Sequence, residues 1–272
     1  MWLASLPWYD LAEVRGALDE LWGSIARRLV EHGVAAVPRW LDRDPDYEAR
    51  WNDPELLLGQ ACGYDAVLGY ADRLRVVATP HFSFAGCDGP HHCSFVVVRA
   101  ECCAQRIVDL RGLRCVINTP TSHSGMNVLR SLVAPLQVEG RFFRSVVLSG
   151  AHEHSLRLLR EDAADVAAID CVTYGLLRRH RPDALAGTRV IHETTRVPAP
   201  PFVTSASTPE PIVHALASAL EHVVQERPDR AVLDALGLVG ISRLDMSAYR
   251  PIAELAHAAR ATDYAELNLE CA

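Results

Sequence analysis

The chain has 272 residues, 49% of them hydrophobic, and a formal net charge of −7 at neutral pH. This length fits one large domain or two smaller lobes, and no apolar run reaches the roughly 20 residues that would span a membrane. Arginine supplies all 27 basic residues, which excludes a P-loop lysine, a Schiff-base lysine and a pyridoxal-phosphate site, and no basic cluster suited to nucleic acid is present.

The N-terminal quarter predicts a strand followed by a long helix. The segment WLASL has the apolar character of a buried strand. Asp10 is expected to cap the following helix, with Glu13 completing a capping box. Gly33 stands where a helix commonly ends at a glycine.

The rest of the chain alternates strand and helix signals. Such alternation is typical of parallel sheets covered by helices on both faces, so the predicted fold class is α/β. In these sheets, ligands bind beyond the carboxyl ends of the strands. The expected strands are residues 56–59, 75–80, 94–100, 114–118, 144–148, 164–170 and 188–195, and the expected helices are 60–70, 122–132, 149–161, 171–180, 210–224 and 249–261.

Unusual polarity is concentrated at five expected strand-to-helix junctions. A site at the carboxyl ends of the strands would draw its ligand-binding residues from these junctions. They are Ser5–Tyr9, Gln60–Tyr64, Thr121–Gly125, Ser149–His154 and Asp170–Tyr174.

Two of these junctions have the composition of anion-binding loops. The first N–H groups of a helix lack intrahelical partners and carry partial positive charge. Ser122, Ser124 and Gly125 would let an anion approach such groups and would add hydroxyl donors. Ser149 and His152 repeat the pattern at the next junction. The alternative is that Ser122 and Ser149 only cap their own helices.

Metal binding is not indicated by the histidine pattern. His152 and His154 would share one face of a strand, but they open a helix, where residues i and i+2 point in different directions. The run His91–Cys93 has no spacing that matches a zinc site. We therefore expect neither a metal nor another cofactor, and we expect His154 to be a surface residue.

Signals for catalysis are weak. The chain has no G-x-S-x-G, H-E-x-x-H or G-x-G-x-x-G motif in a suitable context. Cys62 could be a thiolate nucleophile at a helix start, although a buried structural cysteine is the simpler reading. Asp170, at the end of a strand, could be a base or an acceptor for a ligand hydroxyl or amine, whereas Asp165 is expected to cap or to pair structurally at the start of that strand.

Cysteine usage and the N-terminal sequence bear on the compartment. The eight cysteines are irregularly spaced, and Cys102 and Cys103 are adjacent, which favours free thiols over disulfides. The opening residues lack a basic segment and reach Pro7 and Asp10 too early for a secretory signal. We therefore expect a cytoplasmic location, or a periplasmic one if a signal peptide was removed from this chain.

Several motifs resemble the substrate-binding proteins of phosphate and phosphonate ABC transporters. The segment DLRGLRCVINTPTSHSGMNVLR is similar to the family pattern D-L-x-G-x-x-x-x-x-N-x-x-x-S-x-S-G. The segment SGAHEHSLRLLREDAADVAAIDCVTYGLL resembles the next signature, in which S-G-x-H and a helix precede A-D-V-A-A-I-D. LLLGQACGYDAVL and LGLVGISRLDMSAYRPIAELAHAAR are also similar to the family.

The resemblance implies a two-lobed type II periplasmic-binding-protein fold with two crossover strands and a ligand in the cleft. It implies a first lobe formed by residues 1–85 and 197–272 and a second lobe formed by residues 86–196. The ligand-binding positions that it implies are Tyr9, Tyr64, Ser122, Ser124, Gly125, His152 and Asp170, to which the polar junctions add Gln60 and Ser149.

We therefore expect a protein that binds a small oxyanion, with an ABC permease as a further partner and with neither nucleic-acid binding nor membrane insertion. The alternative is a cytosolic enzyme on the same fold, similar to the chorismate dehydratase-type lyases, with Asp170 or His152 as the base. The sequence contains no convincing acid–base pair, which favours binding over catalysis.

Overall fold

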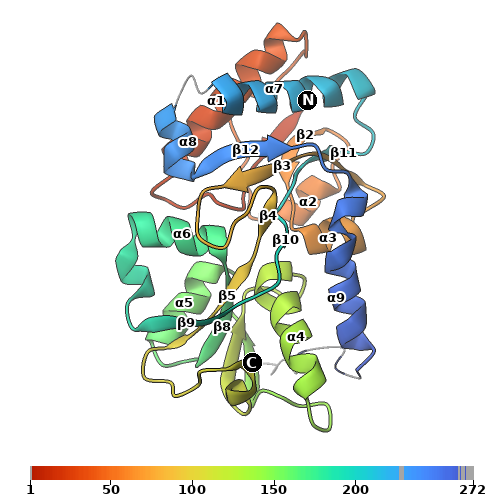
Figure 1. Cartoon of the computed structure of the whole chain (residues 1–272). Coiled ribbons are helices and arrows are strands. Elements are labelled where there is room, and N and C mark those ends of the chain that lie inside the picture. Colours follow the sequence, from red (N-terminus) through yellow and green to blue (C-terminus); the bar gives the residue numbers. More distant parts are fainter. Residues whose placement is uncertain (1, 227–229, 263, 265–266, 268–272) are drawn as a thin grey trace. The chain divides into compact units, whose positions relative to one another are not determined.

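The computed structural model describes residues 2–226, 230–262, 264 and 267 (Figure 1). The chain forms two compact units. Unit 1 comprises Met1–Ser83, Cys87–His91 and Pro198–Arg250, and unit 2 comprises Phe84–Gly86, His92–Val197 and Pro251–Ala272. Two of the passages between the units lie in the short strands β4 (His91–His92) and β10 (Val197–Pro198), which form a two-stranded sheet.

Unit 1 is built on a five-stranded sheet in the order β1-β2-β11-β3-β12. β1 and β2 are parallel, whereas β11 runs antiparallel to both of its neighbours and β12 runs antiparallel to β3. The strands are β1 (Leu3–Ser5), β2 (Leu56–Gln60), β3 (Leu74–Phe82), β11 (Phe202–Ser205) and β12 (Leu238–Ser242).

The helices of unit 1 are mostly amphipathic and pack their apolar faces inward. They are α1 (Arg15–Glu31), α2 (Tyr47–Trp51), α3 (Gly63–Leu68), η5 (Met246–Tyr249), α7 (Glu210–Glu226) and α8 (Arg230–Leu236). In α1, for example, Leu18, Leu21, Trp22, Ile25 and Leu29 are buried.

The predicted capping box of the first helix is wrong. The helix begins at Arg15, and its N-cap residue Val14 makes no side-chain cap. Asp10 instead accepts hydrogen bonds from Nε of Arg15 at 3.3 Å and Nε of Arg43 at 2.7 Å. Asp10 therefore pairs with two arginine side chains rather than with backbone N–H groups of the helix, while Gly33, with φ of 80°, ends the helix as predicted.

Unit 2 contains a second five-stranded sheet, in the order β7-β6-β8-β5-β9, with helices flanking it (Figure 1). Its strands are β5 (Ser94–Arg99), β6 (Arg114–Ile117), β7 (Ser145–Leu148), β8 (Val166–Asp170) and β9 (Thr188–Glu193). Its helices are η1 (Ile107–Leu110), η2 (His123–Asn127), α4 (Val128–Val133), η3 (Ala134–Leu136), α5 (His152–Arg160), α6 (Cys171–His180) and η4 (Pro182–Leu185), together with α9 (Arg250–Arg260) from Pro251 onward.

The predicted α/β class is confirmed, but the sheets are mixed rather than parallel. β6, β7 and β8 run parallel, as the alternating pattern predicts. β5 runs antiparallel to both β8 and β9. A crossover strand that enters a sheet from another unit is not bound by the short β-α-β connections that make neighbouring strands parallel.

The C-terminal segment departs from the predicted division, which placed all of residues 197–272 in the first lobe. Residues from Pro251 onward belong to unit 2. Side chains of unit 2 hold them there: Asn127 donates to the carbonyl of Ile252 at 3.2 Å, and Gln137 donates to that of Thr262 at 3.2 Å.

An ion-pair network joins the starts of β6 and β8. Asp165 accepts hydrogen bonds from Nε of Arg114 at 3.0 Å and from Nη2 of Arg114 at 2.8 Å, and it pairs with Arg99 at 3.1 Å. The hydrogen bonds from Arg114 lower the pKa of Asp165 to about 2. The structural pairing predicted for this aspartate is confirmed.

We expect Asp165→Asn to lose stability at neutral pH and to differ little from the wild type in strong acid. The folded-state pKa lies below the value of about 3.9 for an unfolded aspartate, so the stabilisation is present above about pH 4 and is lost as the pH falls through about 2. Urea unfolding between about pH 6 and pH 2.5 measures this. Asp72→Asn, with a side chain 80% exposed, is the control. If the free energy of unfolding of Asp165→Asn differs from that of the wild type by the same amount at every pH, the assignment is contradicted.

Candidate anion-binding site

The first polar junction of unit 2 forms a π-helical turn after β6. Ser122 is its N-cap residue and accepts a hydrogen bond from the N–H of Gly125 at 3.0 Å. The N–H of Asn127 reaches back five residues to the carbonyl of Ser122 at 2.9 Å. Single π-turns of this kind are rare and occur frequently at functional sites. Ser122 therefore makes the cap that the sequence offered as the alternative.

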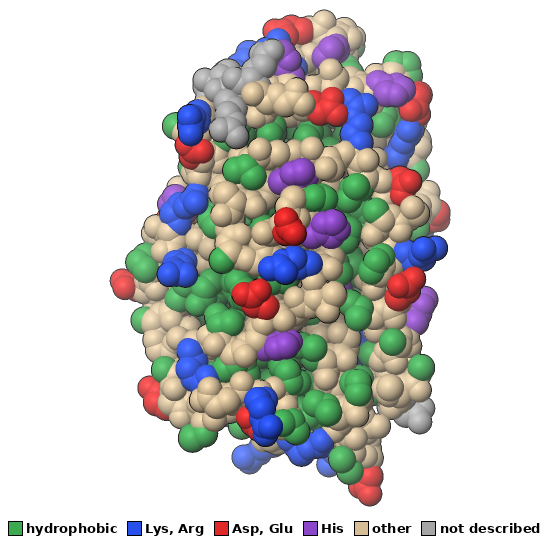
Figure 2. All heavy atoms as spheres, in the orientation of Figure 1, with side chains coloured by type: hydrophobic (Ala, Val, Ile, Leu, Met, Phe, Trp, Pro, Cys, Tyr) green, Lys and Arg blue, Asp and Glu red, His purple; other side chains and the backbone are tan. Residues whose placement is uncertain are grey.

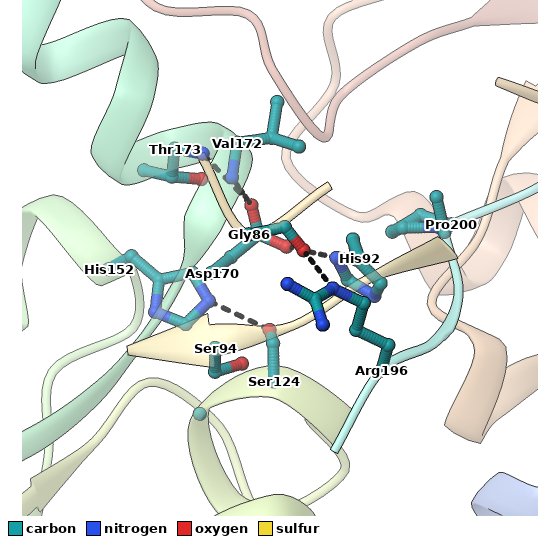
Figure 3. A network of polar contacts seen from close by, with 12 residues as sticks. Gly86, His92, Ser94, Ser124, His152, Asp170, Val172, Thr173, Arg196 and Pro200 are labelled. Atoms are coloured by element: carbon teal, nitrogen blue, oxygen red, sulfur yellow. Dashed lines mark hydrogen bonds and ion pairs between the residues drawn. The ribbon is translucent and has the colours of Figure 1, made fainter. Parts of the chain in front are cut away.

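The Ser124 hydroxyl joins this turn to the next junction. Its Oγ lies 2.9 Å from Nε2 of His152, the first residue of α5 (Figure 3). β6 and β7 are parallel neighbours, so the loops after them leave the same edge of the sheet. The structure thus brings together Ser124 and His152, both predicted as ligand-binding residues.

Gly125 is required by close packing in the same turn. A Cβ atom at this position would lie 1.9 Å from Oδ1 of Asn118 and 3.2 Å from Cε1 of His152. The backbone carbonyl of Asn118 accepts a hydrogen bond from the N–H of Gly150 at 2.9 Å. Asn118 therefore contacts both loops, although sequence reasoning did not single it out.

Ser149 has a structural role in the second turn. Its hydroxyl lies 2.7 Å from that of Ser155, 3.0 Å from the carbonyl of Ala151 and 3.3 Å from that of Ile117. These contacts fix the turn that presents His152. Ser149 does not cap α5, because the N-cap residue is Ala151 and no side chain caps it; a ligand contact of Ser149 stays a prediction.

Asp170 lies at the end of β8 and caps α6. Its Oδ1 accepts hydrogen bonds from the N–H groups of Val172 at 2.8 Å and Thr173 at 2.9 Å. Its Oδ2 lies 2.8 Å from Nδ1 of His92 (Figure 3). The side chains of Asp170 and His92 are each 4% exposed. These contacts fix the orientation of the carboxylate at the start of α6.

Three titratable groups of this cluster, Asp170, His123 and His152, have shifted pKa values. Burial alone would raise the pKa of Asp170, but His92 and the backbone donors hold it below its usual value. Burial lowers the pKa of His123 to about 3 and also lowers that of His152. At neutral pH, His123 and His152 are therefore uncharged and Asp170 is ionised.

Sequence reasoning missed the role of His92. It grouped His92 with His91 and Cys93 as possible metal ligands, whereas the structure pairs it with Asp170. Arg196 also lies beside this pair in Figure 3, where its Nε donates to the carbonyl of Gly86 at 3.3 Å. Both residues come from segments without a helix-start signal, which was the pattern used to find the site.

The predicted residues of unit 1 form a separate set. Tyr9 and Gln60 line one small apolar pocket with Leu6, Leu18, Leu21, Phe82, Phe202, Leu236 and Leu238. Tyr9 packs edge-on against Phe82 with ring centroids 5.1 Å apart, and Nε2 of Gln60 donates to the carbonyl of Pro200 at 3.1 Å. Tyr64 is buried in α3 and does not line this pocket. A ligand in a cleft between the lobes stays a prediction.

The remaining candidates have simple structural positions. Cys62 is buried at the start of α3, which favours the structural reading. His154 is exposed, as predicted, and its Nδ1 lies 3.1 Å from the carbonyl of Ser149. On the face shown in Figure 2, arginine and acidic side chains are interspersed rather than gathered by sign.

The family model for the periplasmic substrate-binding proteins of phosphonate ABC transporters matches residues 45–249, about three quarters of the chain. The chain belongs to this family. No curated protein sequence matches it. Within the described ranges, no helix is both long and apolar enough to cross a membrane.

Solved structures of such proteins share the fold. A binding protein of an ABC phosphonate transporter from Pseudomonas aeruginosa has a TM-score of 0.74 at 17% identity, covering 99% of this chain and 91% of that one. PhnD1 of Prochlorococcus marinus, in complex with methylphosphonate, has a TM-score of 0.74 at 16% identity, covering 96% and 98%. The alkanesulfonate-binding protein SsuA of Xanthomonas axonopodis pv. citri, bound to MOPS, has a TM-score of 0.63 at 14% identity, covering 98% and 95%. The fold is that of the two-lobed periplasmic binding proteins.

Proposed function

We propose that the chain binds a small phosphate- or phosphonate-type oxyanion through Ser124, His152 and the N-terminal turn of α5, and delivers it to an ABC permease. The observation that carries this proposal is the 2.9 Å contact between Ser124 Oγ and His152 Nε2. Two polar groups from successive loops share a hydrogen bond at the edge of the sheet where ligands of α/β folds bind.

The chemistry of the two groups suits an oxyanion. A serine hydroxyl and a neutral imidazole each supply one rotatable or tautomeric donor, and α5 adds the partial positive charge of its N-terminus. Donors aimed at an anion are stronger than those between neutral groups. Ser122 and Gly125 support the loop in this proposal, and Tyr9, Gln60 and Tyr64 stay proposals for contacts from unit 1.

We expect Ser124→Ala and His152→Ala each to weaken methylphosphonate binding by about 1–3 kcal/mol, or roughly 5- to 150-fold, because each removes a hydrogen bond to a charged group. Isothermal titration calorimetry on the full chain measures this. His214→Ala, a histidine 67% exposed on α7, is the matched control. Unchanged affinity in both site variants would refute the assignment.

Family membership supports a periplasmic location. Cell fractionation with immunoblotting is expected to find the chain in the periplasmic fraction, and recovery in the cytoplasmic fraction would contradict this.

The enzyme alternative stays a prediction. Mass spectrometry of methylphosphonate or phosphite after incubation with the chain tests it, since turnover would change the mass of the ligand.

A further inference from the structure

Two buried cysteines of unit 2 lie opposite each other at the ends of neighbouring antiparallel strands. Ser94 of β5 pairs with Asp170 of β8, so the next opposite pair is Cys93 and Cys171. The N–H of Cys171 donates to the carbonyl of Cys93 at 3.1 Å, so the two residues are level across the strands. Opposite residues of antiparallel strands have Cα atoms about 4.5–5.5 Å apart. This separation lies within the roughly 4.4–6.8 Å that a disulfide spans.

The two sulfur atoms point toward the same place. A Cβ atom at Gly86 would lie 2.8 Å from Sγ of Cys93 and 3.1 Å from Sγ of Cys171. A side-chain hydrogen bond joins the two thiols. Gly86 has a φ of 90°, so both its backbone conformation and the neighbouring sulfur atoms favour glycine there. The two cysteine side chains therefore lie on one face of the paired strands and contact each other.

The surroundings of the two thiols favour a bond that forms while the chain folds. Cys93 is 2% exposed and Cys171 is fully buried. The hydrogen bond with Cys171 and burial both raise the pKa of the Cys93 thiol. Since disulfide exchange proceeds through the thiolate, the folded chain shields this pair from an oxidant. Before β5 and β8 pair, both thiols are accessible.

We propose that Cys93 and Cys171 form a disulfide when the chain folds in an oxidising compartment. The family consists of periplasmic proteins, and the periplasm is a compartment in which disulfides form and persist. The irregular cysteine spacing, which favoured free thiols, does not show which cysteines the sheet brings together. The disulfide is independent of the proposed function, because it depends on strand pairing and not on a ligand.

The reaction needs a disulfide as oxidant, and oxidised glutathione supplies it in the test. The thiolate of Cys93 attacks one sulfur of oxidised glutathione, which gives a mixed disulfide and releases one glutathione thiolate. The thiolate of Cys171 then attacks the Cys93 sulfur, which forms the protein disulfide and releases the second glutathione thiolate. The released thiolates take up the two protons that the cysteines lose. Two cysteine thiols are thus oxidised and one glutathione disulfide is reduced.

The bond would join the start of β5 to the start of α6. It would close a loop from residue 93 to residue 171, which contains four of the five strands of the unit 2 sheet, β5, β6, β7 and β8. A disulfide that closes a long loop restricts the unfolded chain and so favours the folded one. The oxidised chain should therefore be more resistant to unfolding than the reduced chain.

Peptide mapping tests the bond directly. The full chain is reduced in urea, freed of the reductant and refolded in a mixture of reduced and oxidised glutathione, and the remaining thiols are alkylated. Trypsin then leaves Cys93 in the segment 76–99 and Cys171 in the segment 161–178. Mass spectrometry is expected to find these two segments joined, with a mass two hydrogen atoms below their sum. Alkyl groups on both cysteines, or a bond from either of them to another cysteine, would overturn the inference.

A Cys87→Ser background removes an ambiguity from the map. The segment 76–99 also contains Cys87, so a bond to this segment could start from either cysteine. With serine at position 87, Cys93 is the remaining cysteine of the segment. Persistence of the joined peptide in this background supports the bond, and its loss assigns the bond to Cys87 and overturns the inference.

Thermal unfolding gives a second measurement. The wild type refolded with glutathione is expected to unfold at least about 4 °C higher than the wild type refolded and kept in a reductant. Cys171→Ala should show no such difference, and Cys93→Ala serves if that variant does not fold. Cys103→Ser, at an exposed cysteine, is the matched control and should respond as the wild type does. A difference of equal size in the wild type and in Cys171→Ala would assign the stabilisation to other cysteines and would overturn the inference.

Discussion

Gly125→Ala is expected to weaken methylphosphonate binding by at least about 2 kcal/mol, or roughly 30-fold. The added Cβ would lie 1.9 Å from Oδ1 and 2.8 Å from Cγ of Asn118, distances that no real contact allows. Either Asn118 or the turn must move. A shift of about 1 Å in that turn breaks the contact between Ser124 and His152.

A double variant tests this cause. Asn118→Ala removes the clashing atoms, so Gly125→Ala should be less harmful in the Asn118→Ala background than in the wild type. Calorimetry gives the affinities, and thermal unfolding of each variant shows whether the fold is retained. Equal losses in the two backgrounds would show that the contact with Asn118 is not the cause.

Gly175→Ala is expected to destabilise the chain by about 1–3 kcal/mol or more, because it overpacks a tight contact inside unit 2. A Cβ at this position in α6 would lie 2.4 Å from both Cγ and Cδ1 of Phe84. Phe84 is 8% exposed, and the guanidinium of Arg179 lies 4.6 Å from its ring centroid. The ring therefore has little room to withdraw.

The matched control is a glycine in an open helical position. Gly23 in α1 has no atom within 4 Å of the position that an added methyl group would take, so Gly23→Ala should stabilise the chain by up to about 1 kcal/mol. Urea midpoints measure both effects. If Gly175→Ala also stabilises the chain, the contact with Phe84 does not destabilise it. If Gly175→Ala lowers the free energy of unfolding less in a Phe84→Ala background than in the wild type, the contact with Phe84 is the cause.

That the turns carrying Ser124 and His152 lie near each other could be predicted, because the signals are local. Each residue lies in a short polar turn directly after a strand, and the strands β6 and β7 are parallel neighbours. The parallel order follows from the β-α-β alternation of the sequence. Once the order is known, the two turns must leave the same edge of the sheet.

The pair formed by His92 and Asp170 could not be predicted in the same way. His92 lies on a two-residue strand, and its partner is far along the chain. The register of β5 with β8, which places Ser94 opposite Asp170, brings them together. Antiparallel pairing of a crossover strand is a tertiary outcome that hydrophobic periodicity does not encode.

Short elements were missed for a related reason. β11 and β12 have four and five residues and run antiparallel to their neighbours in unit 1. The sequence analysis expected no strand at either position and predicted helices at 210–224 and 249–261 on either side of β12. Their antiparallel pairing does not follow from the β-α alternation that revealed the strands of equal length in unit 2.

His92 follows directly after His91, the last residue of its unit 1 segment, so the partner of Asp170 lies at a passage of the chain from unit 1 into unit 2. Nδ1 of His92 lies 2.8 Å from Oδ2 of Asp170, so a change in their separation would change the surroundings of the ring. The ring nitrogens of His92 could thus serve as an intrinsic spectroscopic probe. Their ¹⁵N resonances would register movement of the connecting strand in a sample with no attached label.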